Sequence, residues 1–411
     1  MPRRLRHVLV CGGLLLVAPL VARGQATTGT TPATEATSAP AARPPWYETF
    51  RIRGYGQVRY NRLFESNPDY RCEQCDRSWG NNSLFIRRAR IILQGQIHPR
   101  VFMYLQPDFA SADGASLNIA QVRDWYVDVG LDTLNELRVR IGQSKVPFGF
   151  ENMQSSSNRL PLDRADATNS AHVNERDLGI FLYWAPRRVR ARYQRLLDEN
   201  LKGSGDYGAL ALGVHNGQAP NRADANASLH VVARAAWPFA IGDRLVEAAV
   251  AGYTGRYVVT ADQRSPSVKG VDGWEYRDQR ALVSLAIAPQ PFGLLAEYNV
   301  GRGPEYNPVT DSIETQGLAG GFVTATWKLQ RGDQTFFPFV RYQVYDGGKK
   351  HERDARSHEV EDVEVGVEWQ PMRNFELVAE WYTGRRRFED AQRPVNVQRG
   401  RLFRLQAQFN Y

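Results

Sequence analysis

Residues 403–411 read Phe-Arg-Leu-Gln-Ala-Gln-Phe-Asn-Tyr, and this last stretch of the chain decides the fold. Apolar residues occupy every second position from Phe403 to Tyr411, and polar residues occupy the positions between them. Because successive side chains of a β-strand point to opposite faces, a period of two predicts a strand with one apolar and one polar face. Residues 362–369 and 137–142 repeat the pattern.

The same period recurs along the chain from residue 50 to its last residue. Each segment is long enough for a strand, and the polar face of many of them carries charged side chains. The pattern predicts sixteen strands, at about 50–64, 83–98, 101–110, 117–130, 136–144, 177–185, 207–216, 228–237, 246–258, 278–288, 293–300, 316–329, 335–346, 359–370, 375–384 and 401–411.

Long and short connections alternate between most of the predicted strands. Residues 98–100 and 289–292 are short links, whereas the longest connection covers residues 145–176. The connection 186–206 breaks the alternation, and its residues 187–201 suit a short helix. Alternation of this kind is typical of an up-and-down antiparallel sheet whose two ends face different environments, as in barrels of the bacterial outer membrane.

We therefore predict an all-β fold, a sixteen-stranded antiparallel transmembrane β-barrel of the porin type. One apolar residue in two is sufficient, because one face of the wall meets lipid and the other lines water. Closure of the sheet pairs every backbone N–H and C=O group inside the membrane. A large soluble sandwich or propeller is the alternative that the pattern leaves open.

The first 45 residues differ from the rest. Residues 1–24 combine a basic start with an apolar run at 8–20, and small residues at 22 and 24 precede the predicted cleavage point, as in a secretory signal. The apolar run is shorter than the roughly 20 residues that span a bilayer. Residues 25–45, rich in Thr, Ala and Pro, read as a flexible periplasmic linker. Residues 46–411 are left for the barrel.

The composition excludes several classes of protein. With 18 Tyr, 18 Phe and 9 Trp, the chain is too aromatic for disorder, and three Cys cannot make a disulfide-rich scaffold. A mean hydropathy of −0.47 argues against a multi-helix membrane protein. Removal of residues 1–24 takes away four of the 52 basic residues and none of the 44 acids, which lowers the net charge from +8 to +4. This small excess disfavours a nucleic-acid partner.

Several motifs carry a resemblance to a known family. Residues 84–90 read Leu-Phe-Ile-Arg-Arg-Ala-Arg, residues 104–110 Tyr-Leu-Gln-Pro-Asp-Phe-Ala, residues 122–128 Val-Arg-Asp-Trp-Tyr-Val-Asp, and residues 140–151 Arg-Ile-Gly-Gln-Ser-Lys-Val-Pro-Phe-Gly-Phe-Glu. Together with residues 213–217 and 338–342, they resemble the phosphate-selective porin O and P family. The resemblance covers most of residues 50–411. It implies a sixteen-stranded, trimeric outer-membrane channel for small anions.

If the apolar faces meet lipid, the alternate positions line the lumen. Basic residues concentrate there in the first strands and acids at 362–380, so that two walls of opposite sign would face each other. A basic stripe raises the local concentration of anions. The alternative is that these Arg pair with the acids and only stiffen the wall. The predicted pore-lining residues are Arg51, Arg53, Arg59, Arg88, Arg90, Arg138, Arg140, Arg341 and Arg404.

The connection 145–176 is predicted to fold into the lumen and narrow it, because loops of this length are usually functional. Residues 145–149, Lys-Val-Pro-Phe-Gly, place a rigid Pro near a Gly and suit a sharp inward turn. A loop that stays outside the barrel is the alternative. The charged residues assigned to this constriction loop are Lys145, Glu151, Arg159, Arg164 and Arg176.

Other motifs do not indicate catalysis. Cys72 and Cys75 are predicted to form a local disulfide in the first extracellular loop, since no second pair completes a zinc site. There is no nucleophile elbow or P-loop, and the His-Glu pairs at 351–352 and 358–359 lack the second His of a zinc protease helix. The seven His are scattered along the sequence and indicate no cluster. We predict no enzyme, no metal and no cofactor.

Together the patterns predict a channel in the outer membrane of a Gram-negative-type bacterium. Small hydrophilic solutes, above all anions such as phosphate, are expected to diffuse through it passively. The expected partners are outer-membrane lipid, small anionic or polar solutes and further copies of the chain in a homotrimer, without nucleic acid. The alternative is a non-channel anchor or adhesin that acts through long extracellular loops.

Overall fold

The computed structural model describes residues 45–64, 84–113 and 116–411. The predicted signal at 1–24, the predicted linker up to residue 44, and the predicted disulfide between Cys72 and Cys75 lie outside the described residues. Among the described residues, no helix is long and apolar enough to cross a bilayer.

The described chain consists mostly of β-strands, which follow the predicted positions closely. They are β1 (Arg51–Leu63), β2 (Leu84–His98), β3 (Val101–Asp113), β4 (Ser116–Gly130), β5 (Leu137–Lys145), β6 (Arg176–Trp184), β7 (Leu210–His215), β8 (His230–Ile241), β9 (Arg244–Val258), β10 (Glu275–Ile287), β11 (Phe292–Asn307), β12 (Ser312–Trp327), β13 (Leu329–Arg331), β14 (Gln334–Gly348), β15 (Ser357–Met372), β16 (Phe375–Glu389) and β17 (Val397–Asn410).

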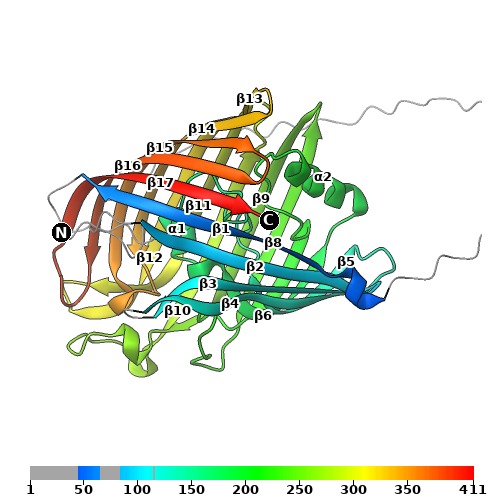
Figure 1. The fold of residues 1–411 in the computed structure, drawn as a ribbon. Coiled ribbons are helices and arrows are strands. Elements are labelled where there is room, and N and C mark those ends of the chain that lie inside the picture. The colour runs from blue at the N-terminus through cyan, green and yellow to red at the C-terminus, as the bar shows by residue number, and fades with distance from the viewer. Residues whose placement is uncertain (1–44, 65–83, 114–115) are drawn as a thin grey trace, which may run out of the picture. The chain divides into compact units, whose positions relative to one another are not determined.

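The strands close into an antiparallel barrel (Figure 1). Each strand pairs with its neighbours in the sequence, and β1 pairs with both β2 and β17, so that the sheet has no free edge. The three-residue β13 pairs with β14 just beyond the part of β14 that pairs with β12. Because β12 and β13 share one position in the wall, the barrel has sixteen strand positions, as predicted from the sequence.

The largest departure from the predicted boundaries lies between β11 and β12. The sequence predicts a loop at 301–315, but the two strands stay paired as far as Asn307 and Ser312, which leaves residues 308–311 as the turn. Gly301, Gly303 and Pro304 interrupt the alternation there. The hydrogen-bond ladder to the neighbouring strand nevertheless continues through them, and a pattern based on side chains alone does not record this ladder.

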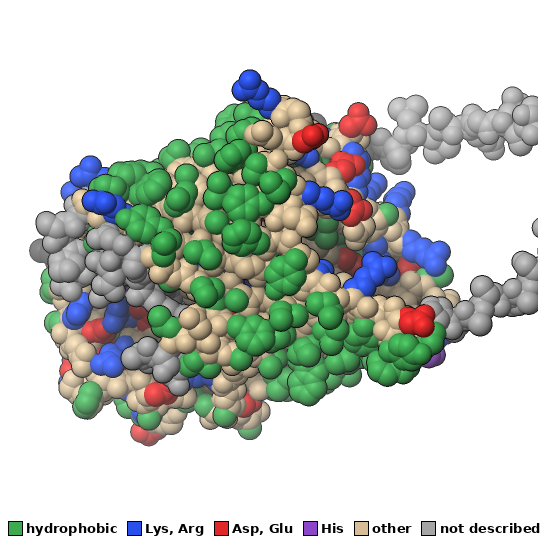
Figure 2. All heavy atoms as spheres, in the orientation of Figure 1, with side chains coloured by type: hydrophobic (Ala, Val, Ile, Leu, Met, Phe, Trp, Pro, Cys, Tyr) green, Lys and Arg blue, Asp and Glu red, His purple; other side chains and the backbone are tan. Residues whose placement is uncertain are grey.

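The two faces of the wall differ as the period of two requires. On β17, Leu405 and Phe409 are exposed on the outer face, whereas Arg404 and Gln406 are buried on the inner face. Figure 2 shows hydrophobic side chains over much of the outer face of the strands and charged side chains gathered near the end where α2 lies. An apolar outer band around a polar interior is typical of a barrel that spans a membrane.

The described helices lie in the connections between strands, except η1, which precedes β1. They are η1 (Trp46–Thr49), α1 (Asp166–Asn169), η2 (Val173–Glu175), α2 (Arg187–Asp198), η3 (Ala261–Gln263), η4 (Asp272–Trp274) and η5 (Arg353–Ala355). The predicted helix within 187–201 is confirmed as α2. It forms because Val189, Tyr193 and Leu196 share one buried face, as spacings of four and three residues require. This face packs against Leu245 of β9 and Ala288.

Candidate functional site

The connection 145–176, here called the constriction loop, lies inside the barrel and touches opposite walls. Ser156 is hydrogen-bonded to the Tyr55 hydroxyl of β1 at 2.7 Å. On the other side, Arg280 of β10 donates to the Ser170 hydroxyl at 2.7 Å, and the Phe150 amide donates to Glu297 of β11 at 3.0 Å. Helix α1 of this loop is visible inside the barrel in Figure 1.

Four buried Arg of the wall hold the carboxylates of the constriction loop. Their nitrogen–oxygen distances are 2.9 Å for Arg59–Asp163, 2.6 Å for Arg404–Asp163, 3.0 Å for Arg341–Glu151 and 2.7 Å for Arg386–Asp166. Burial raises the pKa of Asp163, but the surrounding Arg59, Arg87 and Arg404 outweigh burial and hold it well below its usual range. The loop is thus fixed to the wall formed by β14, β16, β17 and β1.

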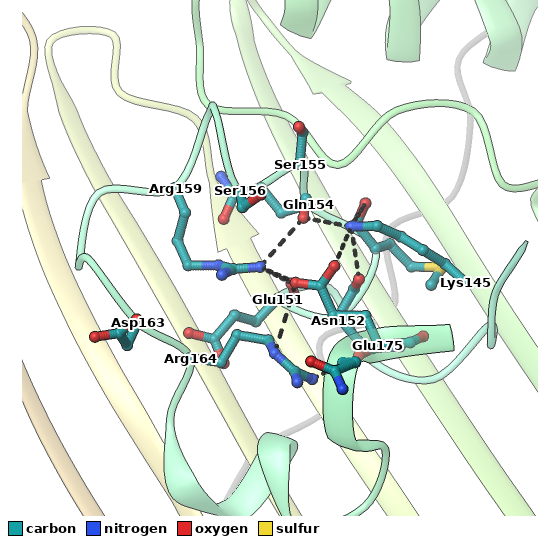
Figure 3. Close-up of polar contacts among 12 residues, drawn as sticks. Lys145, Glu151, Asn152, Gln154, Ser155, Ser156, Arg159, Asp163, Arg164 and Glu175 are labelled. Carbon is teal, nitrogen blue, oxygen red and sulfur yellow. Dashed lines mark hydrogen bonds and ion pairs between the residues drawn. The ribbon is translucent and has the colours of Figure 1, made fainter. Parts of the chain in front are cut away.

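The constriction loop also closes on itself around Glu175 (Figure 3). The Glu175 carboxylate accepts contacts from Lys145 at 3.2 Å, Arg159 at 2.6 Å and Arg164 at 3.6 Å. The Lys145 ammonium also donates to the backbone oxygens of Asn152 at 3.0 Å and of Gln154 at 2.6 Å. The loop therefore keeps one conformation in the lumen through its own ion pairs.

A second segment enters the lumen from the other end of the barrel. After α2, the chain crosses the interior, and Lys202 forms a buried ion pair with Glu368 of β15 at 2.5 Å. The constriction loop meets it there, because Gln154 donates to the Lys202 backbone oxygen at 2.7 Å and Asn158 to the Gly203 backbone oxygen at 2.8 Å. The two inserted segments together fill one side of the lumen.

On the filled side lies a small cavity of about 50 Å³, bordered by Phe150, Leu160, Leu196 and Leu201 among others. On the side of β1 to β5, a much larger cavity of about 740 Å³ remains, here called the open passage. Its lining includes eight basic residues and three acids: Arg53, Arg90, Arg100, Arg138, Arg140, Lys145, Arg176 and Arg190, with Asp124, Asp128 and Asp206.

The sequence-predicted residues divide between these regions. In the open passage lie Arg53, Arg90, Arg138, Arg140, Lys145 and Arg176. Held by the constriction loop are Arg59, Arg341 and Arg404. The remaining residues lie elsewhere. Arg88 donates to Gln57 at 2.7 Å, and Arg51 is exposed at the start of β1. Glu151 and Arg159 border the small cavity, and Arg164 lies inside the loop.

Sequence reasoning missed the part that the connection 185–209 plays in the lumen. It also missed Arg100, Arg190 and Tyr207, which border the open passage. Two signals were present: the unusual length of this connection at the end where links are short, and the apolar face of α2. Neither signal tells on which side of the wall the segment folds.

Arg138 and Arg140 of β5 border the open passage and are held by several polar and aromatic contacts. Arg140 makes two bonds to Asp128, at 2.7 and 2.8 Å, and its guanidinium lies 3.7 Å from the centre of the Tyr126 ring. Arg138 pairs with Asp206 at 3.0 Å. The Nη1 atoms of both Arg are buried and have no hydrogen-bond partner. These two donor groups, on alternate residues of β5, are thus enclosed in the wall of the passage without an acceptor.

Within the part of the chain that the structure describes, no three His, Cys, Asp or Glu side chains are grouped in a way that could hold a metal ion.

A closed sixteen-position barrel, apolar outside and narrowed by an inward loop, defines the class of outer-membrane porins. The chain belongs to the phosphate-selective porin O and P family, whose model matches residues 65–411. It is therefore a channel protein of the Gram-negative outer membrane, and the alternative of a non-channel anchor is set aside.

Solved structures agree on the fold. The outer-membrane channel DcaP of Acinetobacter baumannii and Salmonella typhi OmpF in complex with daunomycin are each 14% identical, with a TM-score of 0.54, and the match covers 88% of this chain and 97% of each of theirs. The in-vitro folded OmpT of Vibrio cholerae in its trimer form is 12% identical, with a TM-score of 0.50, over 88% of this chain and 99% of that one. No curated protein matches the sequence.

Proposed function

We propose that the protein conducts small anions by passive diffusion along the open passage. The observation that carries the proposal is the lining of this passage, in which eight basic residues face three acids. A narrow space bordered by low-dielectric walls concentrates the field of such an excess, and it raises the local concentration of anions. Planar guanidinium groups also match the oxygen geometry of phosphate and carboxylate.

Many Arg of the lumen form ion pairs with acids, which is what the alternative of a merely stiffened wall requires. These ion pairs are unevenly distributed around the lumen. The acids of β15 and β16 are neutralised by buried cations, including Arg341 on Glu364 and Lys202 on Glu368. Behind the lining of the open passage, Asp108 pairs with Arg90, and Glu175 pairs with Lys145 and Arg176. Even with these two acids included, the eight basic residues outnumber the acids around the passage. The excess positive charge of the lumen thus lies where a solute can reach it.

The proposal predicts anion selectivity that depends on the lining of the open passage. In planar bilayers with a KCl gradient, we expect the reversal potential of the wild-type channel to show anion preference, and Arg53→Glu to shift it towards cation preference. Arg53 suits the test because its only described polar contact is a 3.4 Å bond to Gln94. Addition of phosphate should reduce chloride current by competition.

The matched control is Arg331→Glu. Arg331 is exposed at a short turn of the same barrel end but outside the open passage, so the same charge change there should leave the reversal potential nearly unaltered. A cation-selective wild-type channel, or equal shifts in both variants, would contradict the proposal.

We also propose that the protein is a homotrimer. The outer face over β6 to β9 carries a groove of about 570 Å³ lined mainly by Leu and Ala, among them Leu182, Leu212 and Ala233. It lies over β7, which with six residues is much shorter than its neighbour β8. Small side chains on a lipid-facing surface let another chain approach closely. The trimer form of OmpT supports this assembly for the shared fold.

A further inference from the structure

Four histidines that lie far apart in the sequence meet at the long-loop end of the barrel. His172 belongs to the constriction loop, His215 and His230 face each other across β7 and β8, and His351 follows β14. The expectation that the His form no cluster is therefore wrong. Consecutive members are 15 to 121 residues apart along the chain, which hid a proximity that only closure of the barrel creates.

Three of the imidazole rings are packed against one another, and the fourth, that of His351, lies against the Tyr257 ring with the ring centres 5.2 Å apart. The ring centres are 5.5 Å apart for His172 and His215 and 5.3 Å apart for His215 and His230, and the Tyr253 ring lies 4.9 Å from His172. Space around His230 is so limited that a Cβ on Gly217, whose φ is +86°, would lie 1.9 Å from its Nδ1. This tight packing leaves little room for hydration of a charged ring.

The cluster fastens the constriction loop to the wall. A hydrogen bond joins His351 to the backbone of Ala171, next to His172. Adjacent ion pairs join Lys349 to Asp166 of the loop and Lys350 to Asp278 of β10. The segment 349–351 thus clamps residues 166–172 of the loop against the inner face of the barrel.

The charges around the cluster balance only when the imidazoles are neutral. Asp177 of β6 accepts from His215 at 3.0 Å, and Asp278 contacts His230 at 3.2 Å as well as Tyr253 and Lys350. Facing these two acids are the cations Lys350 and Arg280. Arg164 of the loop donates to the His172 backbone oxygen and is itself paired with Glu175.

Protonation would therefore add positive charge to an environment in which two cations already balance the two acids. One nitrogen of each ring, Nε2 of His172, His215 and His351 and Nδ1 of His230, is buried without a hydrogen-bond partner. A proton there would create a buried donor without an acceptor. Burial, together with the nearby Lys350, holds the pKa of His172 and of His351 well below the usual range of histidine.

We propose that this cluster, made of His172, His215, His230 and His351, is an acid sensor that releases the constriction loop and closes the channel at low pH. The space around the constriction loop indicates why its release would close the channel. The open passage borders the constriction loop at Met153, Ser155 and Asn158, so a loop released from the clamp has free volume beside it there. The device is independent of which solute passes.

The pH range follows from the lowered pKa values. A histidine whose pKa is lowered in the clamped state takes up a proton more readily once the loop is released. The clamped state is therefore fully favoured above about pH 6.5, the ordinary pKa of histidine. It loses stability as the pH falls below this value. Each such histidine shifts the balance between the two states by up to about tenfold per pH unit below that value.

Single-channel recording of the full-length mature protein in planar bilayers tests the proposal. Between pH 7.5 and pH 5, the wild-type channel should spend a growing fraction of time closed. His172→Gln and His351→Gln, which cannot gain the proton, should move the onset of closure to lower pH and make the dependence less steep. The conductance of each variant at pH 7.5 shows whether it is folded.

His98→Gln is the matched control, because His98 is exposed at a short turn at the opposite end of the barrel and should keep the wild-type pH profile. Two results would overturn the proposal: a wild-type channel without added closures at pH 5, or His172→Gln and His351→Gln channels that close over the wild-type pH range. If only one of the two variants folds, the other still decides.

Discussion

At the residue scale, Asp163 shows how one side chain of the constriction loop can secure the barrel. It accepts contacts from Arg59 of β1 and Arg404 of β17, the first and last strands, which meet where the barrel closes. Both guanidinium groups are almost completely buried, so no water replaces the carboxylate if it is lost. A single carboxylate thus links the closure of the wall to the position of the loop.

Asp163→Asn should therefore destabilise the barrel. Removing one partner of a buried ion pair typically costs about 3–5 kcal/mol. Because Arg404 keeps its contacts with Glu364 and Glu380, we expect a loss near the lower end of this range. We expect a lower unfolding temperature in detergent, measured by circular dichroism, and noisier single-channel current from a loosely held loop. Asp272→Asn, at an exposed extracellular position, is the control and should alter neither. Equal stability of the two variants would contradict this role of Asp163.

At the scale of elements, two connections from opposite ends of the barrel meet in the lumen. The constriction loop was predictable from its length and from residues 145–149. The inward position of residues 199–204 was not, because an amphipathic helix such as α2 can cover the rim of a barrel as well as its interior. Contacts such as Gln154 to Lys202 join segments about 50 residues apart and leave no local pattern.

Long-range contacts also limit what the sequence can predict about the charged side chains. The period of two correctly placed Arg59, Arg140 and Arg404 on the inner face, because alternation along a strand decides the side of the wall. It could not separate Arg140, which borders the open passage, from Arg404, which holds the loop. That distinction depends on where the loop carboxylates come to lie, and hence on long-range packing.

Deletion of residues 152–172 should raise the conductance. The deletion removes most of the loop from the lumen and exposes three wall Arg that now hold Asp163 and Asp166, namely Arg59, Arg386 and Arg404, so we also expect stronger anion preference in reversal-potential measurements. Deletion of residues 222–226, in the exposed connection between β7 and β8, is the control and should change neither property. Unchanged conductance after removal of 152–172 would show that the loop does not narrow the channel.

At the scale of the whole molecule, the wall carries two kinds of outer surface. Apolar side chains such as Val340 and Phe409 project from much of it, whereas the wall is hollowed over β6 to β9, where Ala233, Ala235 and Gly252 lie between larger Leu side chains. Lipid chains adapt to either surface. A rigid partner gains more contact from the groove, which is why we place the subunit interface there.

Ala233→Trp should weaken the trimer. The indole would fill the groove and keep a neighbouring subunit away, so we expect monomer in place of trimer on electrophoresis of unheated samples in mild detergent. Val340→Trp makes a similar change on β14, outside the groove, and should leave the assembly intact. A trimer that survives Ala233→Trp would place the interface elsewhere on the barrel.

Because the open passage lies off centre, one arc of the barrel supports the structure and another borders the path of the solute. The arc from β14 through β17, with the inserted segments, supplies most of the buried ion pairs, whereas the arc from β2 to β5 borders the space where solutes pass. Changes that retune selectivity can therefore accumulate on one arc without weakening the other. In protein engineering, strands β14 to β17 are therefore best left unchanged, whereas strands β2 to β5 are the place to alter selectivity.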